Sequence, residues 1–218
     1  MYFRIQTILL FVLFAVIATA QESIPGNHDG YIVFYYPNGN KSSEGNLVDG
    51  KPDGYWQSYY EDGTLKAEGN RRFFLLDSIW TFYFPDGTIS QQISYRNDLR
   101  NGYTINYDYW YDEDSVKNHY KKSKILYLNG KREGLSFYYN FKSVLKYSYY
   151  YRNDKRNGRG KEYNKDSVVI TIFEYYDSYL IGRTQVNRKD YTGNKQGKWL
   201  DFHPNGNKKI EKHYLNNK

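Results

Sequence analysis

A repeat with a period of 24 residues constrains the fold of this 218-residue chain more than any other feature. Seven units open in turn with Gly30, Gly54, Ser78, Gly102, Gly134, Gly158 and Gly197. Repeats of this size are supersecondary units that bury their apolar faces by stacking against their neighbours. The intervals that follow Gly102 and Gly158 are 32 and 39 residues long, which predicts two lengthened hairpins.

Two columns of aromatic residues recur in register with the repeat. Five residues after the opening residue, every unit carries a ring, at Tyr35, Tyr59, Tyr83, Tyr107, Tyr139, Tyr163 and Phe202. Two residues after the opening residue, three units carry Trp56, Trp80 and Trp199. We interpret the first column as structural. The tryptophans either pack in the core, which is the commoner role of a ring in register with a repeat, or face solvent and stack on a ligand.

Turn-forming residues divide each unit into two strands. Turns within units are predicted at residues 37–39 and 85–87, and turns between units at Asp49-Gly50, Asn129-Gly130 and Gly193-Asn194. Second strands alternate apolar and polar residues, so each hairpin has an apolar face that pairing with neighbouring hairpins must bury. The sequence therefore predicts an all-β fold, an elongated single antiparallel sheet of tandem β-hairpin repeats with about seven units.

The opening residue of a unit is glycine in six of the seven cases. Glycine adopts positive φ angles without a steric penalty, so the pattern predicts a bend or a left-handed backbone conformation at this position. Ser78 is the exception, and we expect it to mark a locally altered turn.

Composition excludes several classes of protein. Aromatic residues make up 20% of the chain, with 27 Tyr, which is unlike a disordered segment and suits pleated, half-buried strands. The chain has no cysteine, so it is not a disulfide scaffold, and we expect no lipid anchor on a cysteine. The formal net charge is +7 with both signs interspersed, which favours contact with anionic surfaces without a strongly polarised field.

The first 20 residues are typical of a secretory signal peptide. Arg4 precedes an apolar run at residues 8–17 that is too short to span a bilayer, and small residues suit cleavage between Ala20 and Gln21. We predict a signal peptide at 1–20, a short linker at 21–29 and a repeat domain at 30–218. The mature chain is then expected to carry a net charge of +6, to have no transmembrane segment, and to reside in the periplasm or outside the cell.

The sequence offers no convergent set of catalytic or metal-binding groups. None of the four histidines has a partner at a spacing such as His-x-x-x-His, and His203 is interpreted as a substitute ring in an aromatic column. The acidic run Asp112-Glu113-Asp114 could hold a hard cation, but it lacks the order of a calcium loop and is better interpreted as a solvated hairpin tip. We predict no enzyme, no metal and no cofactor. The alternative is hydrolysis of a cell-wall polymer, which an activity assay would test.

These residues resemble the bacterial variant of the MORN repeat, whose units run Gly-x-Trp-x-x-Tyr-Tyr-x-x-Gly before a second strand and a Gly-Lys-x-x-Gly closure. Residues 54–63 match the first half at every fixed position, and Gly197, Trp199, Phe202 and Gly206 match nearly as well. The closure recurs at residues 50–54 and 130–134 and, shifted, at 193–197. The resemblance implies a repeated β-hairpin sheet that often serves as a platform for protein or lipid contact. Some bacterial relatives carry an antitoxin-like label, which implies action in the cytoplasm and conflicts with an export signal.

Two functions fit this pattern. The first is an exported, non-catalytic scaffold that binds an envelope or extracellular protein through the outer face of the sheet and the two lengthened hairpins. The alternative is a module that binds a glycan or another envelope polymer by stacking Trp56, Trp80 and Trp199 on sugar rings. Two basic patches, at residues 121–124 and 208–212, could contact anionic lipid headgroups or protect strand edges from aggregation. Nucleic acid is not an expected partner of an exported chain.

Overall fold

The computed structural model describes residues 29–203 and 207–218 of the chain. The predicted signal peptide, its cleavage site at Ala20 and Gln21, and most of the predicted linker lie outside the described residues. The strands of the described part are β1 (Gly30–Tyr35), β2 (Lys41–Val48), β3 (Lys51–Tyr59), β4 (Leu65–Arg72), β5 (Leu75–Tyr83), β6 (Ile89–Arg96), β7 (Leu99–Tyr111), β8 (Lys117–Leu128), β9 (Lys131–Arg132), β10 (Gly134–Tyr139), β11 (Leu145–Arg152), β12 (Lys155–Tyr163), β13 (Val169–Tyr176), β14 (Tyr179–Gln185), β15 (Arg188–Lys189), β16 (Lys195–Phe202) and β17 (Lys208–Tyr214). Within these ranges no helix is long and apolar enough to cross a membrane.

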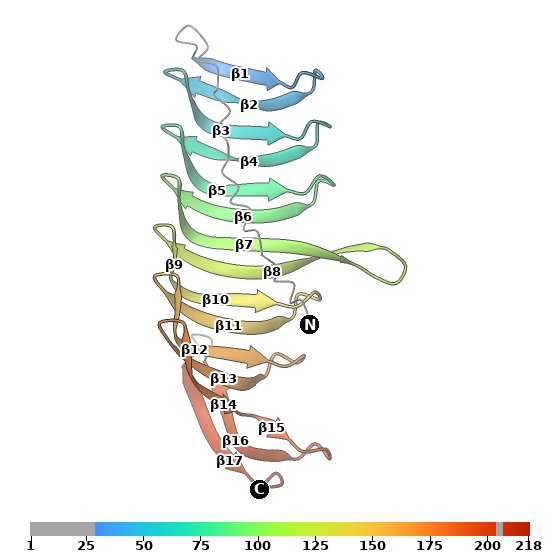
Figure 1. Ribbon diagram of the computed structural model, residues 1–218, viewed down its shortest axis with the longest axis vertical. Coiled ribbons are helices and arrows are strands. Elements are labelled where there is room, and N and C mark those ends of the chain that lie inside the picture. The colour runs from blue at the N-terminus through green and yellow to red at the C-terminus, as the bar shows by residue number, and fades with distance from the viewer. Residues whose placement is uncertain (1–28, 204–206) are drawn as a thin grey trace, which may run out of the picture.

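One long antiparallel sheet of 14 strands confirms the predicted all-β fold of tandem hairpins. Strands that are neighbours in the sequence are neighbours in the sheet from β1 to β8 and from β10 to β14, while the short β9 pairs with β8 at the side. Turns within units lie along one side of the sheet and turns between units along the other (Figure 1). The repeats therefore stack in sequence order, as a solenoid-like array requires.

The prediction of a single sheet has to be corrected for the end of the chain. β15, β16 and β17 form a separate three-stranded sheet, whose last two strands run obliquely to the long sheet (Figure 1). The break falls between β14 and β15. There the Val186 N–H still donates to Ile170 of β13 (3.0 Å), whereas the Asn187 N–H donates to Lys198 of β16 (2.9 Å).

Only one of the two predicted lengthened hairpins exists. β7 and β8, with 13 and 12 residues, form a hairpin that projects beyond its neighbours, as the first long interval predicts (Figure 1). The second prediction is wrong, because the hairpin of β12 and β13 has ordinary strands of 9 and 8 residues. The additional residues form β14 and β15 instead. Gly182 in β14 keeps the 24-residue spacing from Gly158, so the long interval contains the first strand of a further, truncated unit.

The opening residues adopt the predicted left-handed backbone, but the expectation for Ser78 is wrong. Gly54 and Gly134 have φ angles of 72° and 78°, and Ser78 has a φ of 61°, so serine holds the same conformation as the glycines. Gly193 and Asn194 also depart from the prediction, because they lie between β15 and β16 and not between two complete units. Their turn, like those within units, closes with two hydrogen bonds, from Asp190 N to Asn194 O and from Gly193 N to Asp190 O (both 3.0 Å).

The two faces of the long sheet carry different side chains, because successive residues of a strand point to opposite faces. On the face that we call the tryptophan face, Trp56 and Trp80 lie in a core cluster against which Ile32, Phe34, Leu76, Phe82 and Tyr95 pack. Each indole covers a glycine of the preceding strand. A Cβ atom on Gly45 would approach Trp56 to 2.0 Å, and one on Gly69 would approach Trp80 to 2.5 Å.

This pairing of one large with one small residue continues in units that lack tryptophan. Ile93 lies opposite Thr104, and both are buried. Tyr149 lies opposite Gly160, where an added Cβ atom would approach the tyrosine ring to 2.6 Å. Here the large residue, Tyr149, lies on the second strand of one unit, and the small residue, Gly160, lies at the tryptophan position on the first strand of the next unit. The packing of the repeat is therefore preserved where the motif residue is missing.

Candidate functional site

The face opposite the tryptophans, which we call the tyrosine face, carries much of the predicted aromatic column. Tyr59 donates a hydrogen bond to Glu44. Glu68 accepts hydrogen bonds from Tyr83 and from Tyr55 (both 2.5 Å). Because each carboxylate lies on a second strand and its partners lie on first strands, these hydrogen bonds clamp neighbouring strands together.

The acceptors of the column change along the sheet. Tyr107 donates to Gln92 (3.4 Å), and Tyr163 shares a hydrogen bond with Ser148 (3.1 Å). Three column residues have no hydroxyl bond of this kind: Tyr35 is exposed on β1, Tyr139 lies under the Lys121 ammonium (4.3 Å), and Phe202 lies under the Lys161 ammonium (3.6 Å). The column residues therefore contact neighbouring strands, through carboxylates in the units of Tyr59 and Tyr83 and through amide, hydroxyl or ammonium groups in later units.

The protonation states of this ladder suit binding and not acid–base chemistry. Hydrogen bonds from Lys41 and Tyr59 lower the pKa of Glu44 from its ordinary value of 4.5 to about 2. Burial and the hydrogen bond to Glu68 raise the pKa of Tyr55 and of Tyr83 to about 12. Near neutral pH the carboxylate is ionised and the phenols are protonated, so neither group is poised to exchange a proton.

A row of exposed apolar side chains lies beside the column. The position one residue after the opening residue holds Tyr31, Tyr55, Ile79 and Tyr103, each 24 residues from the next and each exposed. These three tyrosines and the isoleucine lie on a regular sheet whose strands hold them at fixed spacings. Rigid aromatic side chains with a polar end are enriched at protein interfaces.

The turn between β4 and β5 differs from every other turn between units in the described sheet. The other five place Asp, Asn, Gly or Ser at their two central positions: Asp49-Gly50, Asn97-Asp98, Asn129-Gly130, Asn153-Asp154 and Asp177-Ser178, all with positive φ. Glycine, asparagine and aspartate, which fill nine of these ten positions, tolerate such angles. Phe73 and Phe74 adopt the same conformation, with φ angles of 50° and 61°, although bulky residues rarely do. Both rings are exposed to solvent, by 73% and 44%.

Polar contacts hold the Phe73–Phe74 turn in place. The Phe73 N–H donates to Asp53 Oδ1 (3.0 Å), and Arg71 Nη1 donates to the Phe74 carbonyl (2.7 Å). The Lys51 ammonium lies 4.8 Å from the centre of the Phe74 ring. Two exposed rings are thus fixed on a turn and bordered by cations. Sequence reasoning missed this feature, although the absence of Asn, Asp and Gly at a unit boundary was a visible signal.

Two of the three tryptophans considered as ligand-stacking residues offer no face to a ligand. Trp56 and Trp80 are only 6% and 4% exposed. Trp199 is half-buried, donates from Nε1 to the Arg188 carbonyl (3.2 Å), and packs edge-on against Tyr214. Their main role in this structure is to fill the space over glycines and close the second sheet.

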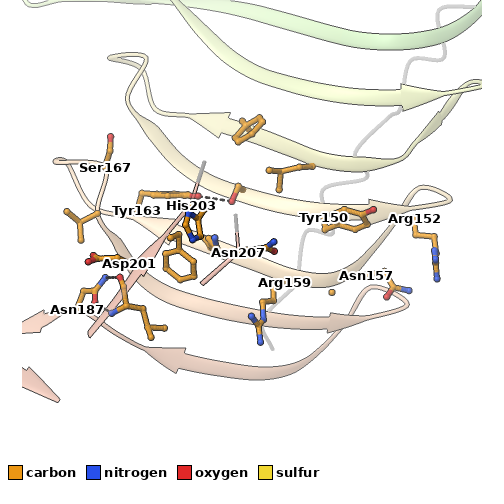
Figure 2. Close-up of a pocket in the computed structure, with 18 residues that line it drawn as sticks. Tyr150, Arg152, Asn157, Arg159, Tyr163, Ser167, Asn187, Asp201, His203 and Asn207 are labelled. Atoms are coloured by element: carbon orange, nitrogen blue, oxygen red, sulfur yellow. Dashed lines mark hydrogen bonds between the residues drawn. The ribbon is translucent and has the colours of Figure 1, made fainter. Parts of the chain in front are cut away.

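A cleft of about 840 Å³ opens where the second sheet rises over the tyrosine face. Its floor comes from β10, β11 and β12, and its wall comes from the end of β16, as Figure 2 shows. The floor carries both rings and cations. The rings are Phe137 and Tyr150, and the cations are Arg152, Arg159 and Lys161. His203, the predicted substitute ring, lines the wall and takes the turn position of Tyr36, with its N–H donating to Asn207 O (2.8 Å).

The lining of this cleft is positively charged. Arg152, Arg159 and Lys161 are its permanent cations, and Asp201 is its one carboxylate among the described residues. Arg159 Nε donates to Glu174 (2.9 Å), yet its side chain stays 63% exposed. Lys161 is buried against the Phe202 ring, and this burial lowers its pKa.

Asn187 joins β16, which forms the wall of the cleft, to β13 of the long sheet. Its Nδ2 donates to the carbonyls of Val169 in β13 (3.0 Å) and Leu200 in β16 (2.9 Å), and its Oδ1 accepts from the Leu200 N–H (2.6 Å). Val169, Val186 and Leu200 form a second buried cluster beside it. Asn187 stands five residues after Gly182, where the repeat predicts an aromatic residue, so the substitution coincides with the break in the sheet.

The acidic run of the long hairpin forms a turn. Asp112 Oδ1 accepts from the Val116 N–H (2.8 Å), and Asp112 Oδ2 accepts from the Asn118 amide (3.1 Å). No group of three or more potential metal ligands gathers among the residues that the structure describes. The carboxylate of Asp112 is therefore engaged in closing the hairpin tip.

Comparison with known families accounts for the repeat. A family model described as MORN repeat variant matches residues 29–49, 52–72, 76–97 and 195–216. Four of the chain's repeat units match the MORN repeat variant. The matched segments are the units that open with Gly30, Gly54, Ser78 and Gly197, and MORN-variant repeats of this kind indicate a repeat-based interaction module, generally without catalytic activity. No curated protein matches the chain.

The three MORN-like hairpins outside the matched segments open with Gly102, Gly134 and Gly158. They carry Thr104, Ser136 and Gly160 at the tryptophan position. At two of these positions a large partner lies on the preceding strand, since Ile93 lies opposite Thr104 and Tyr149 lies opposite Gly160. The structure thus extends the repeat beyond the segments that its sequence motif identifies.

Proposed function

We propose that this chain is an exported, non-catalytic scaffold that binds an envelope or extracellular protein, with Phe73 and Phe74 as the anchor of the interface. The composition of the Phe73–Phe74 turn supports this assignment. Five equivalent turns use residues that suit positive φ, whereas this one uses two phenylalanines and exposes both rings. Residues held in sparsely populated backbone conformations cost about 1–3 kcal/mol each and concentrate at sites where function needs them.

The surroundings of the turn support a protein partner. A compact pair of rings bordered by Arg and Lys has the composition of an interface hot spot, in which aromatic residues and arginine dominate. Tyr55 and Ile79 on the tyrosine face add exposed contact area on the two units that the turn joins, and Tyr31 adds more on the unit before them. A folded protein can cover such an exposed surface, and buried aromatic anchors are typical of protein interfaces.

A paired substitution tests the proposal. Phe73→Asn with Phe74→Gly installs a sequence that favours this turn, so the hairpin is kept while both rings are lost. Tagged wild-type protein and variant would be used to capture proteins from envelope extracts of the native cell, followed by mass spectrometry. We expect a partner that the wild type enriches and the variant does not. The matched control is Phe141→Ala, which removes an exposed ring from a turn within a unit.

Two outcomes would overturn the assignment. If the Phe73→Asn/Phe74→Gly variant captured the same protein as the wild type, the turn would not be the anchor. If the wild type enriched nothing over an unrelated tagged protein, the scaffold itself would be rejected.

The exported location is a second part of the proposal, and it rests on the predicted signal peptide. Cell fractionation followed by N-terminal sequencing is expected to find the chain outside the cytoplasm with Gln21 as its first residue. A chain that begins at Met1 in the cytoplasmic fraction would contradict export and would move the search for the partner into the cytoplasm.

A further inference from the structure

The cleft between the two sheets is built for a ligand that is different from the partner of the Phe73–Phe74 turn. It lies at the other end of the molecule, on β10 to β12 and β16, and its volume of about 840 Å³ falls within the roughly 300–1,000 Å³ typical of small-ligand sites. Such a volume admits a few small rings and excludes a folded domain.

The side chains of the cleft indicate an anionic ligand with a flat, weakly polar face. Arg152 and Arg159 line it, the latter with its Nε on Glu174 and its side chain 63% exposed, and guanidinium forms paired hydrogen bonds with carboxylates. Phe137 and Tyr150 are the rings of the floor. Tyr150 and Asn157, which adds an amide, are labelled in Figure 2. Cation, ring and amide are the groups that bind the carboxylate, the C–H face and the hydroxyls of an acidic sugar.

The backbone of the cleft argues against an extended peptide. β11, in the middle of the floor, is hydrogen-bonded to β10 on one side and to β12 on the other. An extended peptide is usually recognised through main-chain hydrogen bonds at an open strand edge, and this floor offers none. Recognition must come from side chains, as it does for a saccharide.

We propose that this cleft binds an acidic oligosaccharide, with Arg152 and Arg159 holding a uronate carboxylate while Tyr150 and Phe137 stack on the sugar ring. In this proposal the sugar is bound by residues that line a cavity, and not by the tryptophans that the sequence suggested for glycan stacking. It does not depend on the proposed protein partner, because the two surfaces share no residue.

Calorimetric titration of the full chain with trigalacturonate tests this site. We expect saturable binding that weakens as salt is raised, since part of it is electrostatic. Arg152→Ala and Tyr150→Ala are each expected to weaken it about tenfold, because each removes a direct contact. Both side chains are exposed, so both variants are expected to fold, which circular dichroism would verify.

The chain offers a matched control. Arg96 ends β6 as Arg152 ends β11, at the same position of its unit, but it lies away from the cleft. Arg96→Ala is expected to bind trigalacturonate like the wild type. The Phe73→Asn/Phe74→Gly variant should also bind it unchanged, so failure of this site and failure of the proposed scaffold are distinguishable.

Comparison ligands decide the class. Neutral galactotriose and the peptide triglutamate are each expected to bind at least tenfold more weakly, because one lacks the carboxylates and the other lacks the sugar rings. Equal binding of triglutamate would reduce the cleft to a general anion site and overturn the assignment. No binding of trigalacturonate, or equal weakening by Arg96→Ala, would overturn it as well.

Discussion

The Asn187 side chain forms hydrogen bonds with both backbone groups of Leu200, accepting from the N–H at 2.6 Å and donating to the carbonyl at 2.9 Å. The same amide donates to Val169 of the long sheet, so one side chain joins two sheets that share no strand pairing. Asn187 also has a φ of 54°, which asparagine tolerates better than most residues. The position of the second sheet, and with it the cleft, depends on this residue.

Asn187→Ala is therefore expected to destabilise the C-terminal end of the molecule. The substitution removes a hydrogen bond from the buried Leu200 N–H and one from each of two carbonyls, and a buried group left unsatisfied costs about 1–3 kcal/mol. Urea unfolding followed by circular dichroism would measure the loss, with Gln185→Ala, an exposed change on β14, as control. Equal stability of the two variants would show that Asn187 does not join the sheets.

The Phe73→Asn/Phe74→Gly variant is expected to be more stable than the wild type, because Asn-Gly suits a turn with two positive φ angles. Relief of backbone strain and the loss of exposed rings are expected to raise the free energy of unfolding by about 1–3 kcal/mol. Thermal unfolding would show a higher midpoint. A lower midpoint would mean that the rings stabilise the fold, which would remove the reason to assign them a binding role.

Gly69→Ala is expected to lower the free energy of unfolding by about 1–3 kcal/mol, as overpacking of a tight core does. The new Cβ atom would lie 2.5 Å from the Trp80 ring, and both residues are buried. Gly182→Ala is the control, because its Cβ atom would meet only Glu174, at 3.4 Å. The pairing of large and small residues predicts a clear difference between the two alanine variants in urea unfolding.

Glu44 makes the free energy of unfolding depend on pH in the acid range. Its pKa falls from 4.5 to about 2 on folding, so the unfolded chain binds more protons than the folded chain between these values. The stabilisation is complete above pH 4.5 and is lost as the pH falls toward 2. Glu44→Gln keeps an oxygen acceptor for Tyr59 but cannot titrate, so its unfolding midpoint should fall less than that of the wild type between about pH 5 and about pH 2.5. Glu61→Gln, at an exposed turn, should behave like the wild type.

Tryptophan fluorescence reports which rings meet solvent. Trp56 and Trp80 are buried, whereas Trp110 and Trp199 are half-buried. Acrylamide is expected to quench the tryptophan fluorescence of the double variant Trp110→Phe/Trp199→Phe several-fold less than that of the wild type, because only the buried indoles remain. Equal quenching would place Trp56 and Trp80 at the surface and restore them as candidates for stacking on sugars.

Much of the fold follows from the sequence because local signals agree. The 24-residue period, the turn residues and the opening glycines together predict the hairpins, and the backbone at Gly54 and Gly134 has the predicted sign of φ. The exchange between Tyr149 and Gly160 could not be predicted, since a motif describes one strand while packing is shared by two. Ser78 shows the same limit, because pairing with the neighbouring strands holds serine where the motif has glycine.

The candidate sites were harder to predict than the fold. The break at Asn187 depends on a residue that replaces an aromatic ring, and the register of Gly182 reveals it only after the strand pairing is known. The cleft combines residues from β10, β11, β12 and β16, which no spacing in the sequence brings together. The Phe73–Phe74 turn was local and visible, but its meaning required the φ angles of the five equivalent turns.

Site-specific photo-cross-linking in the native cell tests the scaffold most directly. A benzoylphenylalanine at position 73 keeps an aromatic ring on the exposed turn, and the same residue at position 141 replaces Phe141, an exposed ring on the other side of the sheet. We expect one discrete cross-linked protein from position 73 and none from position 141. Cross-links to the same protein from both positions, or from position 141 alone, would contradict the assignment of the Phe73–Phe74 turn as the anchor.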